Sequence, residues 1–232
     1  MSRIYVLGLG PGGAGFIPPR TVELAQSCAL LIGGKRNLEL FLGLFPFLSV
    51  EKREINREIG ALLDFVEASY RKKQVGILVS GDPGLFSLLA PLRRRFPAEI
   101  LDVVPAPSAL QYLFARISLP WHDAVILSLH GRPRDTLAPF LAAAVRRNSK
   151  VGLFTDAKNT PALVCELLLQ QGVGDCLVYI GENLSYPGEK IYRGNLEECC
   201  ALRVGPLNVM VITRDGEDAE FWGLQGTGDA RD

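Results

Sequence analysis

One stretch of the first half of the chain constrains the fold more than any other. Residues 75–79 are apolar and rich in β-branched side chains, which is typical of a buried strand. Residues 80–84, Ser-Gly-Asp-Pro-Gly, end that strand at once, and a helix is predicted from about residue 85 to 95. A strand, a tight turn and a helix in this order place the turn at the carboxyl end of a strand, where open α/β sheets bind their ligands.

Two further loops follow strands in the same way. Residues 3–9 predict a strand that leads into the glycine-rich loop 8–13, and residues 99–104 predict a strand that leads into Pro-Ala-Pro-Ser-Ala-Leu at 105–110. Because three loops of this kind follow three strands, we predict a parallel sheet with a shared pocket at one edge. The competing interpretation is three ordinary connections that bind nothing.

The first loop superficially matches the dinucleotide-binding pattern G-x-G-x-x-G, through Gly8, Gly10 and Gly13. However, Pro11 removes a backbone donor where a pyrophosphate needs one. No acidic residue ends a second strand about twenty residues later, where such sites bind the ribose. The sequence therefore disfavours a nicotinamide site.

A linker is predicted at residues 119–123, Leu-Pro-Trp-His-Asp, because it interrupts the alternation of strands and helices. We therefore expect an α/β fold of two lobes. Residues 1–120 form an N-terminal lobe with a mainly parallel sheet, and residues 124–213 form a C-terminal lobe with a mixed sheet. Residues 214–232 contain six acidic and two basic side chains, which predicts a flexible acidic tail.

Composition limits the partners of the chain. Lysines and arginines number 25 and acidic residues number 25, whereas a nucleic-acid-binding domain is usually clearly basic. The five cysteines show no metal-binding spacing, so no metal is expected. The amino terminus does not resemble a signal peptide, and the apolar run 38–48 is too short to span a membrane. We expect a cytoplasmic protein with no nucleic-acid or membrane partner.

The loops at 8–12, 80–84 and 105–109, in this order and spacing, resemble those of the tetrapyrrole methylase family. These proteins are two-lobed α/β enzymes that use S-adenosylmethionine. Residues 31–41 (LIGGKRNLELF), 128–132 (SLHGR) and 181–184 (GENL) look like the cobalt-precorrin-7 C5-methyltransferase branch of cobalamin synthesis, as do residues 115–116 with 119–121. The resemblance implies methylation at C5 of a late corrin precursor, cobalt-precorrin-7 or precorrin-6Y.

The resemblance also implies site residues. In the family the methyl donor lies folded in the cleft between the lobes. The residues matching those around its methionine part are Gly81, Asp82, Leu85, Phe86, Ser108 and Ala109. Those matching the adenine contacts are Phe154, Thr155, Leu207, Asn208 and Val209. The residues matching the border of the tetrapyrrole trough are Gly8, Gly10, Pro11 and Gly12.

Positioning the carbon nucleophile in line with the methyl group supplies much of the rate, and a base completes the reaction by moving a proton. Asp82 and His130 are the candidate bases. Asp82 suits a loop-stabilising hydrogen bond equally well, and for His130 a structural hydrogen bond in its loop is favoured. Arg116 and Arg132 are candidates to bind substrate carboxylates, although Arg116 equally suits a solvated helix position.

The resemblance implies a homodimer. Related enzymes with an additional carboxyl-terminal domain also methylate C15 and decarboxylate. The short acidic tail of this sequence leaves no room for such a domain, so we expect the C5 reaction here and a separate protein for C15. Three alternatives stay open: another methyltransferase of the superfamily, acting on a different precorrin carbon or as a diphthine synthase; an RNA methyltransferase, which the balanced charge disfavours; and a non-catalytic nucleotide-binding module. The residues do not distinguish a cobalt-containing substrate from a metal-free one.

Overall fold

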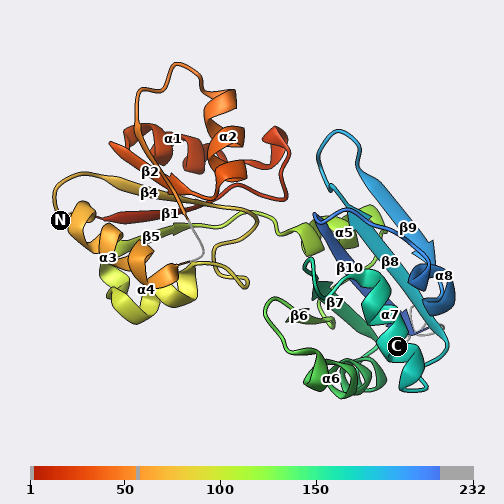
Figure 1. Cartoon of the computed structure of the whole chain (residues 1–232). Helices are drawn as coiled ribbons and strands as arrows, with labels where there is room; N and C mark the ends of the chain where they lie inside the picture. The colour runs from red at the N-terminus through yellow and green to blue at the C-terminus, as the bar shows by residue number, and fades with distance from the viewer. Residues whose placement is uncertain (1–2, 56–57, 215–232) are drawn as a thin grey trace, which may run out of the picture. The chain divides into compact units, whose positions relative to one another are not determined.

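The computed structural model of the protein describes residues 3–55 and 58–214 and divides into two compact units (Figure 1). Unit 1 consists of Met1–Arg116 together with Asn183–Glu189. Unit 2 consists of Ile117–Glu182 and Lys190–Asp232. Both units are α/β structures, which confirms the predicted fold class.

Unit 1 contains a five-stranded parallel sheet in the order β3-β2-β4-β1-β5. Its strands are β1 (Ile4–Gly8), β2 (Leu30–Gly33), β3 (Glu51–Glu54), β4 (Val75–Val79) and β5 (Leu101–Val104). Its helices are α1 (Pro19–Ser27), α2 (Lys35–Leu44), α3 (Ile59–Tyr70), α4 (Leu89–Arg95) and α5 (Ala109–Arg116), with short 3-10 turns η1 (Ala14–Phe16) and η2 (Ala98–Ile100).

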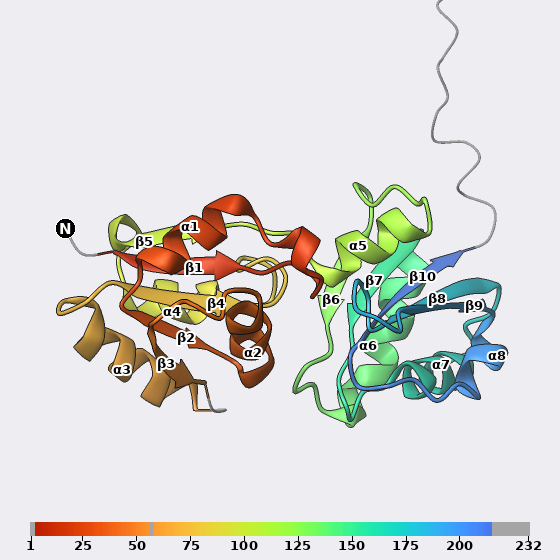
Figure 2. The ribbon, with the colours of Figure 1, turned by 90° about the horizontal axis from the view of Figure 1, so that it is seen from above.

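Helices cover both faces of this sheet, as parallel strands require: α1 and α2 lie above the strands in Figure 1 and α3 and α4 below them, while Figure 2 looks onto the sheet. All five residues of β4 are buried. Ile77 of β4 packs in a core with α3 and α4, whereas Leu78 packs in a second core with α1 and α2. Alternate side chains of a strand point to opposite faces, so a continuous apolar run is needed at the centre of the sheet. That requirement explains why residues 75–79 predicted a buried strand.

Unit 2 contains a mixed sheet in the order β6-β7-β10-β8-β9, in which only β6 and β7 pair in parallel. Its strands are β6 (Val125–Ser128), β7 (Lys150–Phe154), β8 (Cys176–Glu182), β9 (Lys190–Gly194) and β10 (Asn208–Arg214). Its helices are α6 (Arg134–Arg147), α7 (Pro161–Gln170) and α8 (Leu196–Cys200). The prediction of a mixed second sheet is confirmed.

The structure differs from the sequence predictions in four places. The strand expected over residues 99–104 begins at Leu101, because residues 98–100 form the 3-10 turn η2. The units divide between Arg116 and Ile117, before the expected boundary at residue 120. Asn183–Glu189 groups with unit 1, although a second lobe continuous over 124–213 was predicted. The helix expected from residue 85 begins at Leu89, because Phe86 takes a positive φ of 51° that no helix accommodates.

One prediction falls on residues that are not described: the acidic tail lies outside the described residues from position 215 onward. Within the described residues, no helix is long and apolar enough to cross a membrane.

Candidate functional site

The three loops that the sequence singled out meet in unit 1, because the strands that precede them are neighbours. β1 lies between β4 and β5, and all three end at the same edge of the sheet. The N–H of Gly81 donates to the carbonyl of Gly10 at 2.8 Å, and the N–H of Leu9 donates to the carbonyl of Val79 at 2.9 Å. These bonds join the first two loops directly.

Backbone approaches backbone closely where the loops meet. A Cβ atom added to Gly8 would lie 2.8 Å from the Cβ of Ala106 and 2.8 Å from the carbonyl oxygen of Gly81. Gly81 itself has a φ of +65°, and its α-carbon faces Ser108. The loops therefore form a surface of main chain and small side chains, which only glycine permits at these positions.

Asp82 stabilises its own loop. Its Oδ1 accepts a hydrogen bond from the N–H of Gly84 at 2.7 Å, and its carbonyl accepts one from the N–H of Leu85 at 3.2 Å. Phe86 follows with a positive φ of 51° and an exposed ring. A non-glycine residue in this region costs free energy, so the surrounding loop must fix it. The predicted loop-stabilising hydrogen bond of Asp82 is present; a catalytic role stays a prediction.

Ser108 caps helix α5. Its hydroxyl oxygen accepts from the N–H of Gln111 at 3.1 Å, while its own N–H donates to Oε1 of Gln111 at 2.7 Å. Only 2% of Ser108 is exposed, and Ala109 beside it is half-buried. The arrangement is that of a capping box, which fixes where the helix begins. Ser108 thus lies against Gly81, and its hydroxyl is engaged by the helix.

The predicted residues of unit 2 also lie together. Phe154 at the end of β7 pairs with Val209 near the start of β10. The hydroxyl of the buried Thr155 donates to the carbonyl of Asn208 at 3.1 Å and also bonds the side-chain oxygen of Asn208. The amide of Asn208 donates in turn to the carbonyl of Gly205 at 2.6 Å. Side-chain hydrogen bonds therefore fix these two strand ends, and Leu207 directly precedes β10.

The loop that carries His130 lies beside them, because β6 pairs with β7. The N–H of Leu129 donates to the carbonyl of Phe154 at 2.8 Å. Nδ1 of His130 lies 3.1 Å from the hydroxyl of Ser128, and the histidine is exposed. The structural hydrogen bond that was favoured for His130 is therefore present.

Arg132 is held in a fixed orientation. Its Nε donates to the carbonyl of Ser128 at 2.9 Å, and its guanidinium carbon lies 4.1 Å from the ring centre of Phe140. A guanidinium on an aromatic face keeps its outer N–H groups available for a planar anion. Arg116 is engaged differently, because its Nε donates to Oε1 of Glu189 at 2.8 Å.

Sequence reasoning missed two residues of the turn that follows β7. Asp156 accepts hydrogen bonds from the N–H groups of Lys158 and Asn159, each at 2.7 Å, and from that of Gly131 at 3.3 Å. Burial raises the pKa of the Asp156 carboxyl, but these three bonds outweigh burial and lower that pKa below its usual value. Asn159 donates to the carbonyls of Leu129 at 2.8 Å and Arg132 at 3.3 Å.

Together, Asp156 and Asn159 fix the loop of His130. The available sequence signal was an acidic residue three positions before an asparagine at a strand end, a pattern typical of turns.

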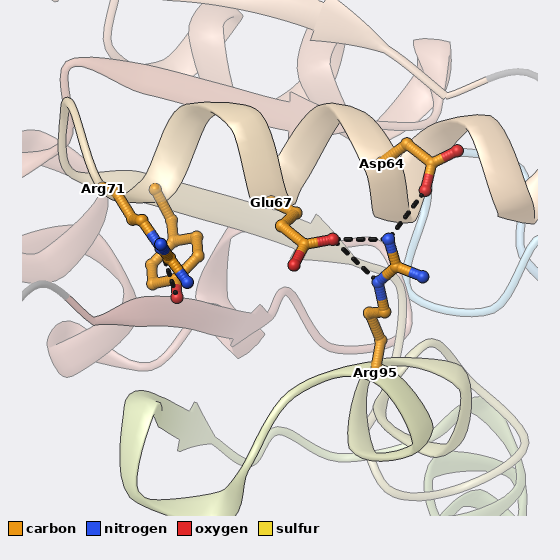
Figure 3. Close-up of polar contacts among 5 residues, drawn as sticks. Asp64, Glu67, Arg71 and Arg95 are labelled. Atoms are coloured by element: carbon orange, nitrogen blue, oxygen red, sulfur yellow. Dashed lines mark hydrogen bonds and ion pairs between the residues drawn. The ribbon is translucent and has the colours of Figure 1, made fainter.

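A depression of about 440 Å³ lies elsewhere in unit 1, on α3 and α4. In it Arg95 forms ion pairs with Asp64, at 3.0 Å, and with Glu67 (Figure 3). Nε of Arg71 donates to the hydroxyl of Tyr70 at 3.2 Å. α3 leads into β4 and α4 leads towards β5, so the carboxyl ends of these helices lie near the amino ends of the strands. The three loops lie at the other end of the strands. The depression is a solvated charged surface. No cluster of described residues has the composition of a metal site.

Comparison of the sequence with known proteins matches this chain to one family. The family model described as Tetrapyrrole (Corrin/Porphyrin) Methylases matches residues 3–200. The cobalt-precorrin-7 C(5)-methyltransferase of Salmonella typhimurium is 34% identical over 189 residues, which cover 82% of this chain and 89% of that protein.

Two solved structures share the fold. The crystal structure of precorrin-6Y methylase from Archaeoglobus fulgidus has a TM-score of 0.67 at 20% identity and covers 91% of this chain and 97% of that one. The uroporphyrin-III C-methyltransferase of Thermus thermophilus, complexed with S-adenosylhomocysteine, has a TM-score of 0.70 at 21% identity and covers 91% of this chain and 92% of that one.

Proposed function

Because the chain belongs to the tetrapyrrole methylase family, we propose that it is an S-adenosylmethionine-dependent C-methyltransferase. Its substrate in this proposal is a late corrin precursor of cobalamin biosynthesis, cobalt-precorrin-7 or precorrin-6Y, methylated at C5. The observation that supports this most strongly is the meeting of the three loops at one edge of the parallel sheet. The name of the Salmonella relative, which is 34% identical over 189 residues, supports the C5 position.

The residues present fit the methyl donor. Gly81 has a left-handed backbone, and the atoms nearest to a Cβ added there belong to Ser108, so the surface proposed for the donor consists of main chain and small side chains here. When bound, S-adenosylmethionine supplies a methyl group on a sulfonium. The unit 1 residues proposed to bind it are Gly81, Asp82, Leu85, Phe86, Ser108 and Ala109. The unit 2 residues proposed to bind it are Phe154, Thr155, Leu207, Asn208 and Val209.

We propose that the tetrapyrrole is bound by the first loop and by Arg132 in the loop of His130. The residues of the first loop are Gly8, Gly10, Pro11 and Gly12. Arg132 suits a carboxylate because its guanidinium is already oriented by Phe140 and the Ser128 carbonyl, so less side-chain entropy is lost on binding. Arg116 remains a predicted contact of the substrate. Its Nε donates to Glu189, so its other guanidinium nitrogens would bind the substrate carboxylate.

In the proposed reaction the sulfur–methyl bond breaks as the new carbon–carbon bond forms, and the sulfur retains the electron pair of the broken bond. A proton at the methylated carbon is then lost or moved, and Asp82 or His130 is the proposed acceptor. The chain contributes chiefly by holding the carbon in line with the methyl group.

Two substitutions separate the roles of Asp82. Asp82→Asn keeps an Oδ1 atom to accept from Gly84 but removes the charge, whereas Asp82→Ala removes both. If Asp82 only stabilises its loop, the asparagine variant retains turnover, and the alanine variant binds S-adenosylhomocysteine roughly 5–10-fold more weakly because one hydrogen bond is lost. If Asp82 is the base, both variants lose turnover. Unchanged donor affinity and turnover in both would contradict the assignment of this loop.

The remaining elements of the proposal are a homodimer, a cytoplasmic location, and a separate protein for C15 methylation and decarboxylation. Size-exclusion chromatography with light scattering tests the dimer.

The proposal is tested by incubating the purified chain with S-adenosylmethionine and a panel of late cobalt-containing and metal-free precorrins. We expect one compound to gain the mass of a single methyl transfer. Transfer to a different precorrin would indicate another methylase of the superfamily. Calorimetry without S-adenosylhomocysteine binding would favour a non-catalytic module and overturn the proposal.

A further inference from the structure

The segment Asn183–Glu189 joins two strands of unit 2 but belongs to unit 1. β8 ends at Glu182 and β9 begins at Lys190, so the segment is the tip of a hairpin. A hairpin tip needs only a few residues to reverse the chain. The contacts of this tip with unit 1 therefore need an explanation beyond the connection of β8 to β9.

The backbone of the segment is unusual. Asn183 and Ser185 have positive φ angles of 49° and 65°, and Gly188 has one of 87°. Two non-glycine residues in this conformation within a few positions cost free energy, and such strain persists only where the surroundings fix it. Internal hydrogen bonds supply part of that restraint, since the N–H of Tyr186 donates to the carbonyl of Asn183 at 3.0 Å.

The segment covers the end of the first glycine loop. The N–H of Gly13 donates to the hydroxyl oxygen of Ser185 at 2.7 Å. A Cβ atom added to Gly12, whose φ is +147°, would lie 1.9 Å from the ring of Tyr186. A Cβ atom at Gly13 would lie 2.6 Å from the carbonyl oxygen of Ser185. The tip and the loop are therefore packed directly against each other.

Glu189 anchors the segment to helix α5. Its carboxylate accepts from Nε of Arg116 at 2.8 Å and from the N–H of Ser185 at 2.7 Å, and it also hydrogen-bonds Tyr112. The Glu189 side chain is 17% exposed. Burial raises its pKa, but these three donors outweigh burial and hold that pKa below its usual value. Tyr112 also packs edge-on against Phe16, which follows the glycine loop.

We propose that the segment 183–189 is a positioning element for the tetrapyrrole-binding loop, with Glu189 as the residue that fixes it. The inference rests on the proposed function, because it takes the loop 8–12 to border the tetrapyrrole. Glu189 does not touch the reacting atoms in this proposal. It holds Ser185 and Tyr186 against Gly12 and Gly13, and so presets the shape of the loop before substrate binds.

The test compares Glu189→Gln and Glu189→Ala with the wild type in the full chain. We expect KM for the tetrapyrrole to rise about tenfold in the alanine variant and less in the glutamine variant, which keeps the shape and some hydrogen bonds. The dissociation constant for S-adenosylhomocysteine should change less than twofold, because no hydrogen bond found among the described residues joins Glu189 to the loops at 80–86 and 105–109. Deuterium uptake at residues 9–16 should increase.

A matched control is Arg95→Ala, which breaks an ion pair of the same unit on α3 and α4 (Figure 3). It should leave KM, donor affinity and uptake at residues 9–16 unchanged. The proposal is overturned if Glu189→Ala leaves KM and deuterium uptake at the wild-type values, or if it weakens donor binding as much as tetrapyrrole binding. Hydrogen exchange needs no substrate, so it tests the positioning role even if the wild type transfers no methyl group and the proposed function fails.

Discussion

In unit 1 the residues proposed for the donor lie in and beside loops whose shape depends on glycine, whereas in unit 2 they lie at strand ends joined by side-chain hydrogen bonds. Gly8 and Gly81 allow main chain to approach main chain, and a Cβ atom at Gly8 has no space. Thr155 and Asn208 instead connect β7 to β10 through a hydroxyl and an amide. The two units should therefore respond to different kinds of substitution: added atoms in unit 1, and lost polar groups in unit 2.

The largest expected effect is that of Gly8→Ala. The new methyl group would overlap the Cβ of Ala106 and the carbonyl oxygen of Gly81, neither of which is the end of a flexible side chain. We expect a loss of about 2–3 kcal/mol in the free energy of unfolding, measured by urea denaturation. Gly15→Ala is the control, because an added Cβ there meets no atom within 4 Å. Equal stability of the two variants would contradict the close meeting of the loops.

A smaller effect is expected from Thr155→Val in unit 2. The substitution keeps the side-chain shape but removes the hydroxyl that bonds Asn208, at a cost of about 1–2 kcal/mol in the free energy of unfolding. Binding of S-adenosylhomocysteine should weaken as well if this strand end contacts the donor. Thr213→Val provides the control, since Thr213 is also buried in the sheet and no side-chain hydrogen bond is found for it among the described residues. Equal losses in both would mean that the bond to Asn208 is unimportant.

The smallest effect is a pH dependence at Asp156. Its carboxyl has a lowered pKa in the folded chain, so its contribution to stability is present above the unfolded value of about 3.9 and is lost as pH falls through the folded value. Asp156→Asn should therefore destabilise the protein at neutral pH, and the difference from wild type should shrink below about pH 4. Thermal unfolding across pH measures it. A difference that does not vary with pH would show that the carboxylate charge is irrelevant.

The same difference between the units explains what could be predicted from the sequence. A loop that needs a left-handed backbone or a close approach of main chain needs glycine there, so its residue types indicate its geometry. Residues 80–84 and 8–12 could therefore be placed at strand ends from residue types alone. The order of the strands was not predicted, because all strands of a parallel sheet end at the same edge and loops there fit many orders; that β1 lies between β4 and β5 comes from the structure. In unit 2 the hydrogen bond between Thr155 and Asn208 joins residues 53 positions apart, and neither residue type indicates which residue it bonds.

The segment 183–189 shows the limit most clearly. Its hydrogen bond from Gly13 to Ser185 spans 172 positions, and local residue patterns contain no information on such a pairing. Arg116 was ambiguous for the same reason, because its partner Glu189 lies on another part of the chain. Phe86 misled the helix prediction, since its apolar side chain suits a helix while its backbone adopts a positive φ.

The central claim is transfer of a methyl group to C5, and the most direct measurement locates that methyl group. The purified chain would be incubated with cobalt-precorrin-7, or with precorrin-6Y, and S-adenosylmethionine carrying a carbon-13 methyl label. Nuclear magnetic resonance of the product should show a single labelled methyl group on C5. Label on C15 or on any other carbon, or no label in either product, would contradict the account.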